Sequence, residues 1–242
     1  MEDTMKRTLF VLSSIFFVGS AFAVTPGHYV YGGLGYSNGD FDFGSVENFF
    51  VADPNDSDAT VTNHRDIDKS SLAFKLGFGY RYNEYFALEG SYAYLGKAKA
   101  KFEGTHETVP IGVTQPQKDF AGMNASMTAH VFAVDVLAIY PVNKYFEVFA
   151  KAGAGLAFTK TKGSEWNGYY SSYGDLGDYE SQSFSKSKAR FVPKLGVGAE
   201  WKATDKIAVR FEYERLFGMS KESDYTVDAD YDFVNVGIKY TF

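Results

Sequence analysis

The chain of 242 residues has no cysteine and only 6 prolines. Without cysteine no disulfide can hold an exported fold together, so strand pairing and packing must do so. Beyond the N-terminal segment there is no run of 18 apolar residues, which excludes a membrane-spanning helix there. The net charge of −6 argues against a basic surface for nucleic acid. Abundant instead are aromatic residues, 18% of the chain, and 24 glycines, a composition typical of all-β proteins.

The N-terminus carries the three parts of a secretory signal peptide. Lys6 and Arg7 form a short positive region, residues 9–18 are apolar apart from two serines, and residues 21–23 read Ala-Phe-Ala. A basic region, a short apolar run and small residues at a cleavage site are typical of such a segment. We therefore predict a signal peptide over residues 1–23 and a mature protein over residues 24–242.

Apolar and polar residues alternate in several segments of the mature part. At the C-terminus, valine, isoleucine and aromatic residues occupy the even positions of 234–242, whereas glycine and polar residues occupy the odd ones. The same alternation occurs over residues 72–82, 195–201 and 207–213. A period of two indicates strands with one apolar and one polar face. In a soluble sandwich the apolar face is the core, and in a membrane barrel it meets lipid while the polar face lines the lumen.

The lengths of the connections favour the barrel. Short connections lie at residues 82–85, 141–144 and 202–206. Long polar stretches lie between them, at about residues 38–69, 97–127, 161–188 and 219–230. Transmembrane barrels alternate short periplasmic turns with long extracellular loops. We predict an all-β fold: an eight-stranded antiparallel up-and-down transmembrane β-barrel with four long extracellular loops and both termini in the periplasm.

The last strand carries a pattern of its own. Ile238, Tyr240 and Phe242 are spaced by two and end the chain on an aromatic residue. This pattern resembles the C-terminal signal that the barrel-assembly machinery of the outer membrane reads. We interpret these three residues as an assembly signal and expect that machinery as a partner.

Several segments resemble the membrane domain of OmpA-type outer-membrane proteins. They are residues 79–96, which read GYRYNEYFALEGSYAYLG, residues 140–143, and residues 193–213. The segments occur in the family's order and cover most of the strands but none of the loops. The resemblance implies a bacterial outer-membrane barrel with charged residues inside it. The chain is expected to lack the C-terminal peptidoglycan-binding domain of the full-length family members.

The lumen is expected to hold a charge network. Residues on the inward-facing positions, by alternation or by segment match, are Lys75, Arg81, Glu89, Asp135, Lys151, Lys194, Glu200, Arg210 and Glu212. With Glu147, Glu214 and Lys239 the inward charges number six basic and six acidic residues, so the lumen would be neutral overall. A lumen lysine of the family falls at Leu137 here, which makes a partner switch copied from the family doubtful.

No catalytic or metal site is expected. Residues 35–39 match G-x-S-x-G, but no helical pattern follows, as a nucleophile elbow requires. The four histidines show no repeated spacing, and no cofactor motif is present. We expect a non-enzymatic surface protein with a polar, largely plugged lumen, in contact with outer-membrane lipid, lipopolysaccharide, and host or phage ligands. The alternative is a small gated pore or a channel for hydrophobic ligands, because Leu137, Ile139 and Phe149 also face inward.

Overall fold

The computed structural model of the chain describes residues 26–41, 60–109, 116–173, 175–220 and 229–242. The predicted signal peptide over residues 1–23 lies outside these ranges. Within these ranges every regular element is a β-strand. The described residues contain no helix that is long and apolar enough to cross a membrane. The strands are β1 (Gly27–Phe41), β2 (Thr60–Asp68), β3 (Ser70–Arg81), β4 (Phe86–Thr108), β5 (Gln117–Pro141), β6 (Phe146–Tyr170), β7 (Leu176–Lys202), β8 (Ile207–Ser220) and β9 (Ala229–Thr241).

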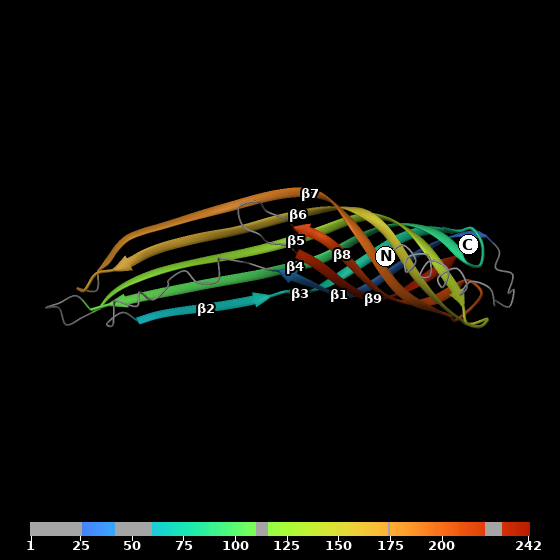
Figure 1. Cartoon of the computed structure of the whole chain (residues 1–242), viewed down its shortest axis with the longest axis horizontal. Helices are drawn as coiled ribbons and strands as arrows, with labels where there is room; N and C mark the ends of the chain where they lie inside the picture. The colour runs from blue at the N-terminus through green and yellow to red at the C-terminus, as the bar shows by residue number, and fades with distance from the viewer. Residues whose placement is uncertain (1–25, 42–59, 110–115, 174, 221–228) are drawn as a thin grey trace, which may run out of the picture.

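Eight of the nine strands close into a ring. Their order is β4-β3-β1-β9-β8-β7-β6-β5, and a further pairing between β4 and β5 joins the two ends. All pairs are antiparallel, and β9 pairs with β1, so that the start of β1 and the end of β9 lie at the same end of the ring (Figure 1). The ninth strand, β2, pairs only with β4 and lies outside the ring. The predicted eight-stranded antiparallel barrel is confirmed.

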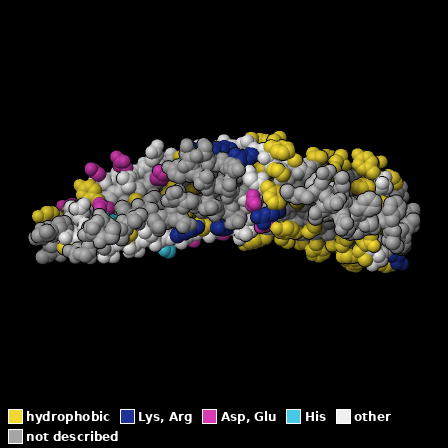
Figure 2. Space-filling view, in the orientation of Figure 1, with side chains coloured by type: hydrophobic (Ala, Val, Ile, Leu, Met, Phe, Trp, Pro, Cys, Tyr) yellow, Lys and Arg dark blue, Asp and Glu magenta, His cyan; other side chains and the backbone are white. Residues whose placement is uncertain are grey.

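The outer wall of the barrel is apolar. Along each strand, exposed hydrophobic side chains alternate with buried ones, and many are more than half exposed, among them Leu72 at 69% and Phe78 at 68%. Figure 2 shows the hydrophobic side chains gathered over the part of the molecule in which the eight strands run side by side. Such a continuous apolar band is what a lipid-facing barrel wall requires.

The three short turns share one device. The side chain of Asn83 accepts hydrogen bonds from the backbone N–H groups of Tyr85 and Phe86, at 2.8 and 2.9 Å. Asn143 does the same for the equivalent groups of its turn, at the same distances. In the third turn the hydroxyl of Thr204 takes this place. These side chains satisfy donors that a tight turn leaves unpaired, which is why short polar sequences suffice there.

The long connections differ from the prediction. Most of residues 97–127 belong to β4 and β5, and most of residues 161–188 belong to β6 and β7. Within residues 38–69, β1 continues to Phe41 and β2 occupies residues 60–68, while residues 42–59 lie outside the described ranges. Residues 219–230 include the end of β8 and the start of β9, with residues 221–228 not described. Figure 1 shows β4, β5, β6 and β7 running on well past the shorter strands as two long hairpins.

The physical reason for this difference is that the hairpin extensions have no lipid to face. Lysine alternates with alanine over residues 97–101, and serine takes every second position over residues 181–187. Neither pattern offers the apolar face by which a membrane strand is recognised in sequence. Backbone pairing holds the hairpins, with β5 and β6 in register from Lys118 opposite Tyr170 to Pro141 opposite Glu147.

Candidate functional site

The strongest chemical feature of the molecule is the set of charged side chains inside the barrel. Six basic and six acidic residues are buried there: Lys75, Arg81, Lys151, Lys194, Arg210, Lys239, Glu89, Asp135, Glu147, Glu200, Glu212 and Glu214. The nine residues predicted for the lumen network are all among them. They come from β3 to β9, and each occupies the face of its strand opposite to the apolar wall. Equal numbers of the two signs allow every buried charge to be paired.

Arg210 of β8 lies at the centre of the network. Its Nη1 and Nη2 atoms lie 2.5 and 3.0 Å from the two carboxylate oxygens of Glu89 on β4, across the barrel. Its Nε atom donates to Glu212 at 2.8 Å. The guanidinium also lies over the rings of Tyr31 and Phe149, 4.5 and 4.4 Å from their centroids. A fork of two parallel bonds to one carboxylate, held between two aromatic rings, is the geometry in which arginine binds most specifically.

Two lysines join the carboxylates of β8 to the opposite wall. Lys75 of β3 lies 3.1 Å from Glu212 and 2.5 Å from Glu214. Lys151 of β6 lies 2.6 Å from Glu212 and also contacts Glu214. Glu212 therefore accepts from several cations at once, as well as from the amide of Asn235 at 3.1 Å. Such shared carboxylates tie four strands of the barrel together through a single cluster of charges.

Lys194 and Asp135 extend the cluster. The Lys194 Nζ atom lies 2.7 Å from Asp135 Oδ2, an ion pair without the geometry of a hydrogen bond, and it donates to Glu214 at 3.2 Å. Asp135 stands directly opposite Glu89 on the neighbouring strand. Residue 137, where the resemblance expects a lysine, is a buried leucine, and Asp135 is the buried charged residue of β5.

A second group of charges lies nearer the three short turns. The carboxylate of Glu147 lies 2.7 Å from Arg81 and 2.9 Å from Lys202. Lys239 of the last strand contacts Glu200 and lies 3.6 Å from Glu147. Arg81 also donates to two backbone carbonyl groups of the first turn, those of Asn83 and Glu84. Arg81 thus joins the ion pairs at this end of the lumen to the backbone of the first turn.

Apolar side chains fill the remaining lumen. Toward the long hairpins, beyond the charges, lies a cluster of buried residues: Ala73, Ala93, Leu95, Ala98, Ala129, Val131, Ala133, Ala157, Val192, Leu216, Met219, Tyr231 and Phe233. We call this the apolar cap. A second cluster holds Leu137, Ile139 and Phe149 against Tyr29, Tyr31 and Ala87. The inward apolar residues of β5 and β6 therefore pack against tyrosine rings.

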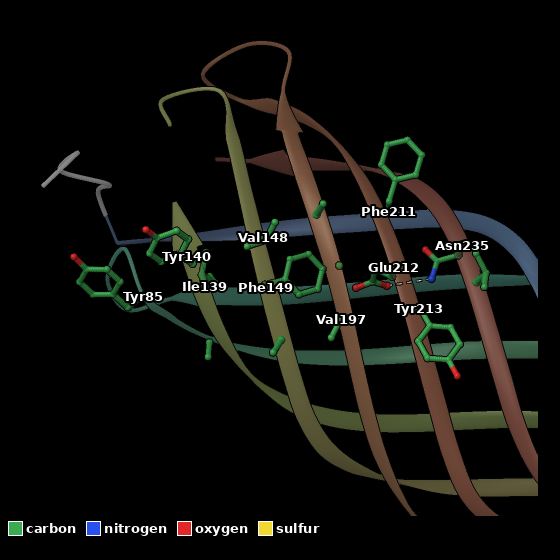
Figure 3. A pocket seen from close by; sticks show the side chains of 15 residues that line it. Tyr85, Ile139, Tyr140, Val148, Phe149, Val197, Phe211, Glu212, Tyr213 and Asn235 are labelled. Carbon is green, nitrogen blue, oxygen red and sulfur yellow. Dashed lines mark hydrogen bonds between the residues drawn. The ribbon is translucent and has the colours of Figure 1, made fainter. Parts of the chain in front are cut away.

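One hollow bounded by described residues lies at the wall of the barrel. It has a volume of about 780 Å³, and outward-facing side chains of β5 to β9 form much of its lining. In Figure 3, Phe211 and Tyr213 project from β8 on either side of Glu212, which is joined to Asn235 by a hydrogen bond. Tyr140, Phe211 and Tyr213 are each 40% exposed or more. Buried residues such as Phe149 and Glu212 line the hollow as well, so outward-facing and inward-facing side chains both border it.

The G-x-S-x-G segment is part of a straight strand. Ser37 lies within β1, is buried, and donates its hydroxyl to the backbone carbonyl of Leu95. The strand continues to Phe41, so the sharp turn and the helix of a nucleophile elbow are missing from this described segment.

The predicted assembly signal lies on the outer wall. Ile238, Tyr240 and Phe242 are 61%, 38% and 70% exposed, and the last two rings meet edge to face with centroids 5.4 Å apart. Their role in recognition stays a prediction.

Sequence reasoning missed the apolar cap. Its members share the inward face with the charged residues, for example Val192 two positions from Lys194 and Leu216 two positions from Glu214. At those positions an apolar residue makes both faces of the strand apolar, which hides the alternation. The sequence did carry a signal: toward the long hairpins, the inward positions of each strand change from charged to apolar residues.

Comparisons with known proteins identify one family, one related sequence and several similar solved structures. The family model of the OmpA-like transmembrane domain matches residues 28–242. A protein of Coxiella burnetii described as uncharacterized is 25% identical over 228 residues, which cover 89% of this chain and 85% of that protein.

Solved structures with a similar strand arrangement include the three that follow. Ail of Yersinia pestis, solved in complex with the heparin analogue sucrose octasulfate, is 16% identical, with a TM-score of 0.43 over 89% of this chain and 99% of that one. Neisserial surface protein A is 10% identical, with a TM-score of 0.43 over 90% of this chain and 100% of that one. The N-terminal barrel domain of OprF from Pseudomonas aeruginosa is 9% identical, with a TM-score of 0.41 over 89% and 98%.

Proposed function

Because this chain belongs to the family of OmpA-like transmembrane domains and is an integral β-barrel of the bacterial outer membrane, we propose that it is a non-enzymatic structural and surface protein. In this proposal the lumen is plugged, the three short turns and both termini face the periplasm, and the two long hairpins project from the cell. The barrel-assembly machinery would insert it. Lipopolysaccharide would surround it, and host or phage ligands would meet its hairpins.

The observation that carries the proposal is how the lumen is filled. An eight-stranded barrel has an interior just wide enough for side chains to fill. Here the twelve buried charges pair across that space, and the apolar cap lies over them toward the hairpins. The apolar cap supports a plugged lumen, because water and ions that pass the charged layer would also have to cross the cap. A filled lumen leaves the exposed surfaces as the functional part of the molecule.

The direct test of the plug is conductance. The refolded mature protein is reconstituted in planar bilayers, and its folded state is verified by the shift in gel mobility on heating. We expect no discrete openings from the folded barrel. Regular single-channel steps from verified, folded protein would overturn the proposal that the lumen is plugged.

The direction of insertion has its own test, for which the lack of cysteine is useful. Ser172→Cys places the only thiol in the turn between β6 and β7. In intact cells a membrane-impermeant maleimide should label this variant, whereas Asp205→Cys, in the third short turn, should be labelled only after lysis. The opposite result would reverse the proposed orientation.

A gated pore is the second candidate, and one geometric feature favours it. Arg210 contacts both Glu89 and Glu212, while Lys151 lies 2.6 Å from Glu212 and 3.9 Å from Glu89. Two cations thus lie within reach of the same two carboxylates, so they could exchange partners without a change in the backbone. If openings are observed, Arg210→Ala should alter their size or frequency. Openings insensitive to this substitution would exclude gating by the network.

A further inference from the structure

An exposed group of lysines lies on the outer surface just beyond the apolar wall. Lys97, Thr128 and Lys160 stand side by side on β4, β5 and β6. One step further along the same strands stand Lys99, Ser126 and Lys162. We call these six residues the lysine patch. Neighbouring strands are about 4.8 Å apart. Each row therefore holds two ammonium groups, with a hydroxyl group on the strand between them.

A β-bulge places the lysines of β4 on this surface. The register between β4 and β5 shifts between Tyr94 and Lys97, where Gly96 has a positive φ of 77°. Before the bulge, odd-numbered residues of β4 such as Glu89 and Ala93 face the lumen. After it, Ala98, Ala100 and Phe102 are the buried residues and the odd-numbered lysines are exposed. Without the extra residue the lysines would point to the inner side.

The patch adjoins an aromatic border of the apolar wall. The row next to it consists of Tyr94, His130 and Phe158 on the same three strands. Tyr92 donates or accepts a 2.8 Å hydrogen bond with His130 and packs against Phe132, with ring centroids 5.0 Å apart. Aromatic rows of this kind mark the level of the lipid headgroups on barrel walls. In Figure 2, Lys and Arg side chains appear where the hydrophobic surface ends.

The four lysines are available to bind. None of them forms an ion pair with another residue in the part of the chain that the structure describes. On β5 and β7, the strands on either side of β6, the residues opposite Lys160 and Lys162 are all serine or threonine. The nearest carboxylates are those of Asp68 opposite Lys99 and Asp66 opposite Lys101, both on β2 at the edge of the patch. Lys101 itself is paired with Glu103 at 2.8 Å. The positive charge of the patch therefore lies on β4 and β6, and Asp68 of β2 adjoins it only beside Lys99.

We infer that the lysine patch binds the phosphate groups of an outer-leaflet lipid whose acyl chains lie on the aromatic and apolar wall of β4 to β6. Charge complementarity selects an anionic group, because the four lysines supply ammonium donors for phosphate oxygens. The hydroxyl groups of Ser126 and Thr128 donate instead to the backbone carbonyl groups of Lys162 and Lys160. The unbroken continuation of the patch into the apolar wall selects a lipid, because a soluble anion would gain nothing from that wall. The inference rests on the proposed function, since the patch meets this leaflet only if the long hairpins face outward.

The test measures binding of bisphosphorylated lipid A to the folded barrel in non-ionic detergent by native mass spectrometry. Each lysine near an anionic surface contributes an interaction equivalent to about fivefold in affinity. Lys97→Gln with Lys160→Gln should therefore weaken binding about 25-fold. Lipid A from which both phosphates have been removed should bind the wild type and this variant equally weakly.

A matched control removes the same charge elsewhere on the hairpins. Lys118, paired with Glu107, lies far from the aromatic border, and Lys186 lies on the opposite face of the sheet from the patch. Lys118→Gln with Lys186→Gln should change affinity less than threefold. An equal loss in both double variants would mean general charge attraction and would overturn the site, as would full binding by Lys97→Gln with Lys160→Gln.

Inorganic pyrophosphate separates a lipid site from an anion site. It should fail to displace lipid A at millimolar concentration, because it lacks the contacts to the apolar wall. Displacement at the concentration at which pyrophosphate itself binds would overturn the lipid assignment. The conductance and labelling experiments test the proposed function without lipid A. A failure of lipid A binding can therefore be distinguished from a failure of the proposed function.

Discussion

Arg210 and Glu89 are 121 residues apart in the chain and form a two-bond ion pair across the barrel, at 2.5 and 3.0 Å. The side chains of both residues are at most 2% exposed. The pair joins β4 to β8, strands that are not neighbours in the sheet. It therefore acts as a cross-link through the lumen, whereas the backbone hydrogen bonds act only along the wall.

Removing one member of this pair should destabilise the barrel strongly. Arg210→Ala leaves Glu89 and Glu212 buried with one cation fewer, and an unpaired buried charge costs about 3–5 kcal/mol. We expect the free energy of unfolding in urea, measured in lipid vesicles, to fall by that amount. A loss below about 1 kcal/mol would mean that water or Lys151 replaces the guanidinium.

The double variant provides the comparison for this pair. Glu89→Gln alone should also be destabilising, because Arg210 loses its two-bond partner. Arg210→Ala combined with Glu89→Gln should cost less than the sum of the two single changes, since no charge of this pair is then left unpaired. Additive losses would show that the two residues contribute independently.

Much of the fold and part of this network could be predicted from the sequence. The inward position of a residue such as Lys75 or Glu212 follows from a strand alternation of two, because one face is apolar. Which charges meet could not be predicted, because Lys194 and Asp135 come from separate strands whose facing depends on the closure of the whole barrel. The extension of β4 to β7 was missed because residues 97–101 alternate lysine with alanine, and this part of β4 has no apolar outer face. A bulge at Gly96 also exchanges the inward and outward positions of β4, and the alternation before Gly96 does not predict this exchange.

Two glycines of β3 leave room for tyrosine rings inside the barrel, and the ring of Tyr31 lies against Arg210. A Cβ atom on Gly77 would lie 2.3 Å from the ring of Tyr31, and one on Gly79 would lie equally close to the ring of Tyr29. Gly77→Val should therefore push Tyr31 from its place over the guanidinium. Overpacking of this kind costs about 1–3 kcal/mol, to be measured by urea unfolding. Gly32→Val is the control, because its nearest neighbour is the flexible end of the outward Leu76 side chain.

The turn asparagines should contribute to stability in equal amounts. Asn83 and Asn143 each accept two backbone hydrogen bonds in their turns, with matching distances. Alanine at either position leaves these donors to water, and loss of such a bond costs about 0.5–1.5 kcal/mol. We expect comparable decreases in the free energy of unfolding for the two variants and an additive decrease for the double variant, because they lie in different turns. Replacement by aspartate, which keeps an acceptor oxygen, should restore most of the loss.

Gly96 should decide on which side of the sheet the lysines of β4 lie. Its φ of 77° suits glycine, and a Cβ atom there would lie 2.2 Å from the Ser71 hydroxyl oxygen. Deleting the residue removes the bulge, so Lys97 and Lys99 would turn toward the apolar cap while Ala98 would turn outward. The deletion should destabilise the barrel, because lysines would replace alanines against the cap, and should also abolish the lysine patch on β4. Labelling at Lys97→Cys by a water-soluble maleimide measures the side directly, since the chain has no other cysteine. Labelling should be fast in the full-length background and slow in the deletion background. Equal labelling rates in the two backgrounds would show that residue 97 faces outward without the bulge. The bulge would then not be what exposes these lysines.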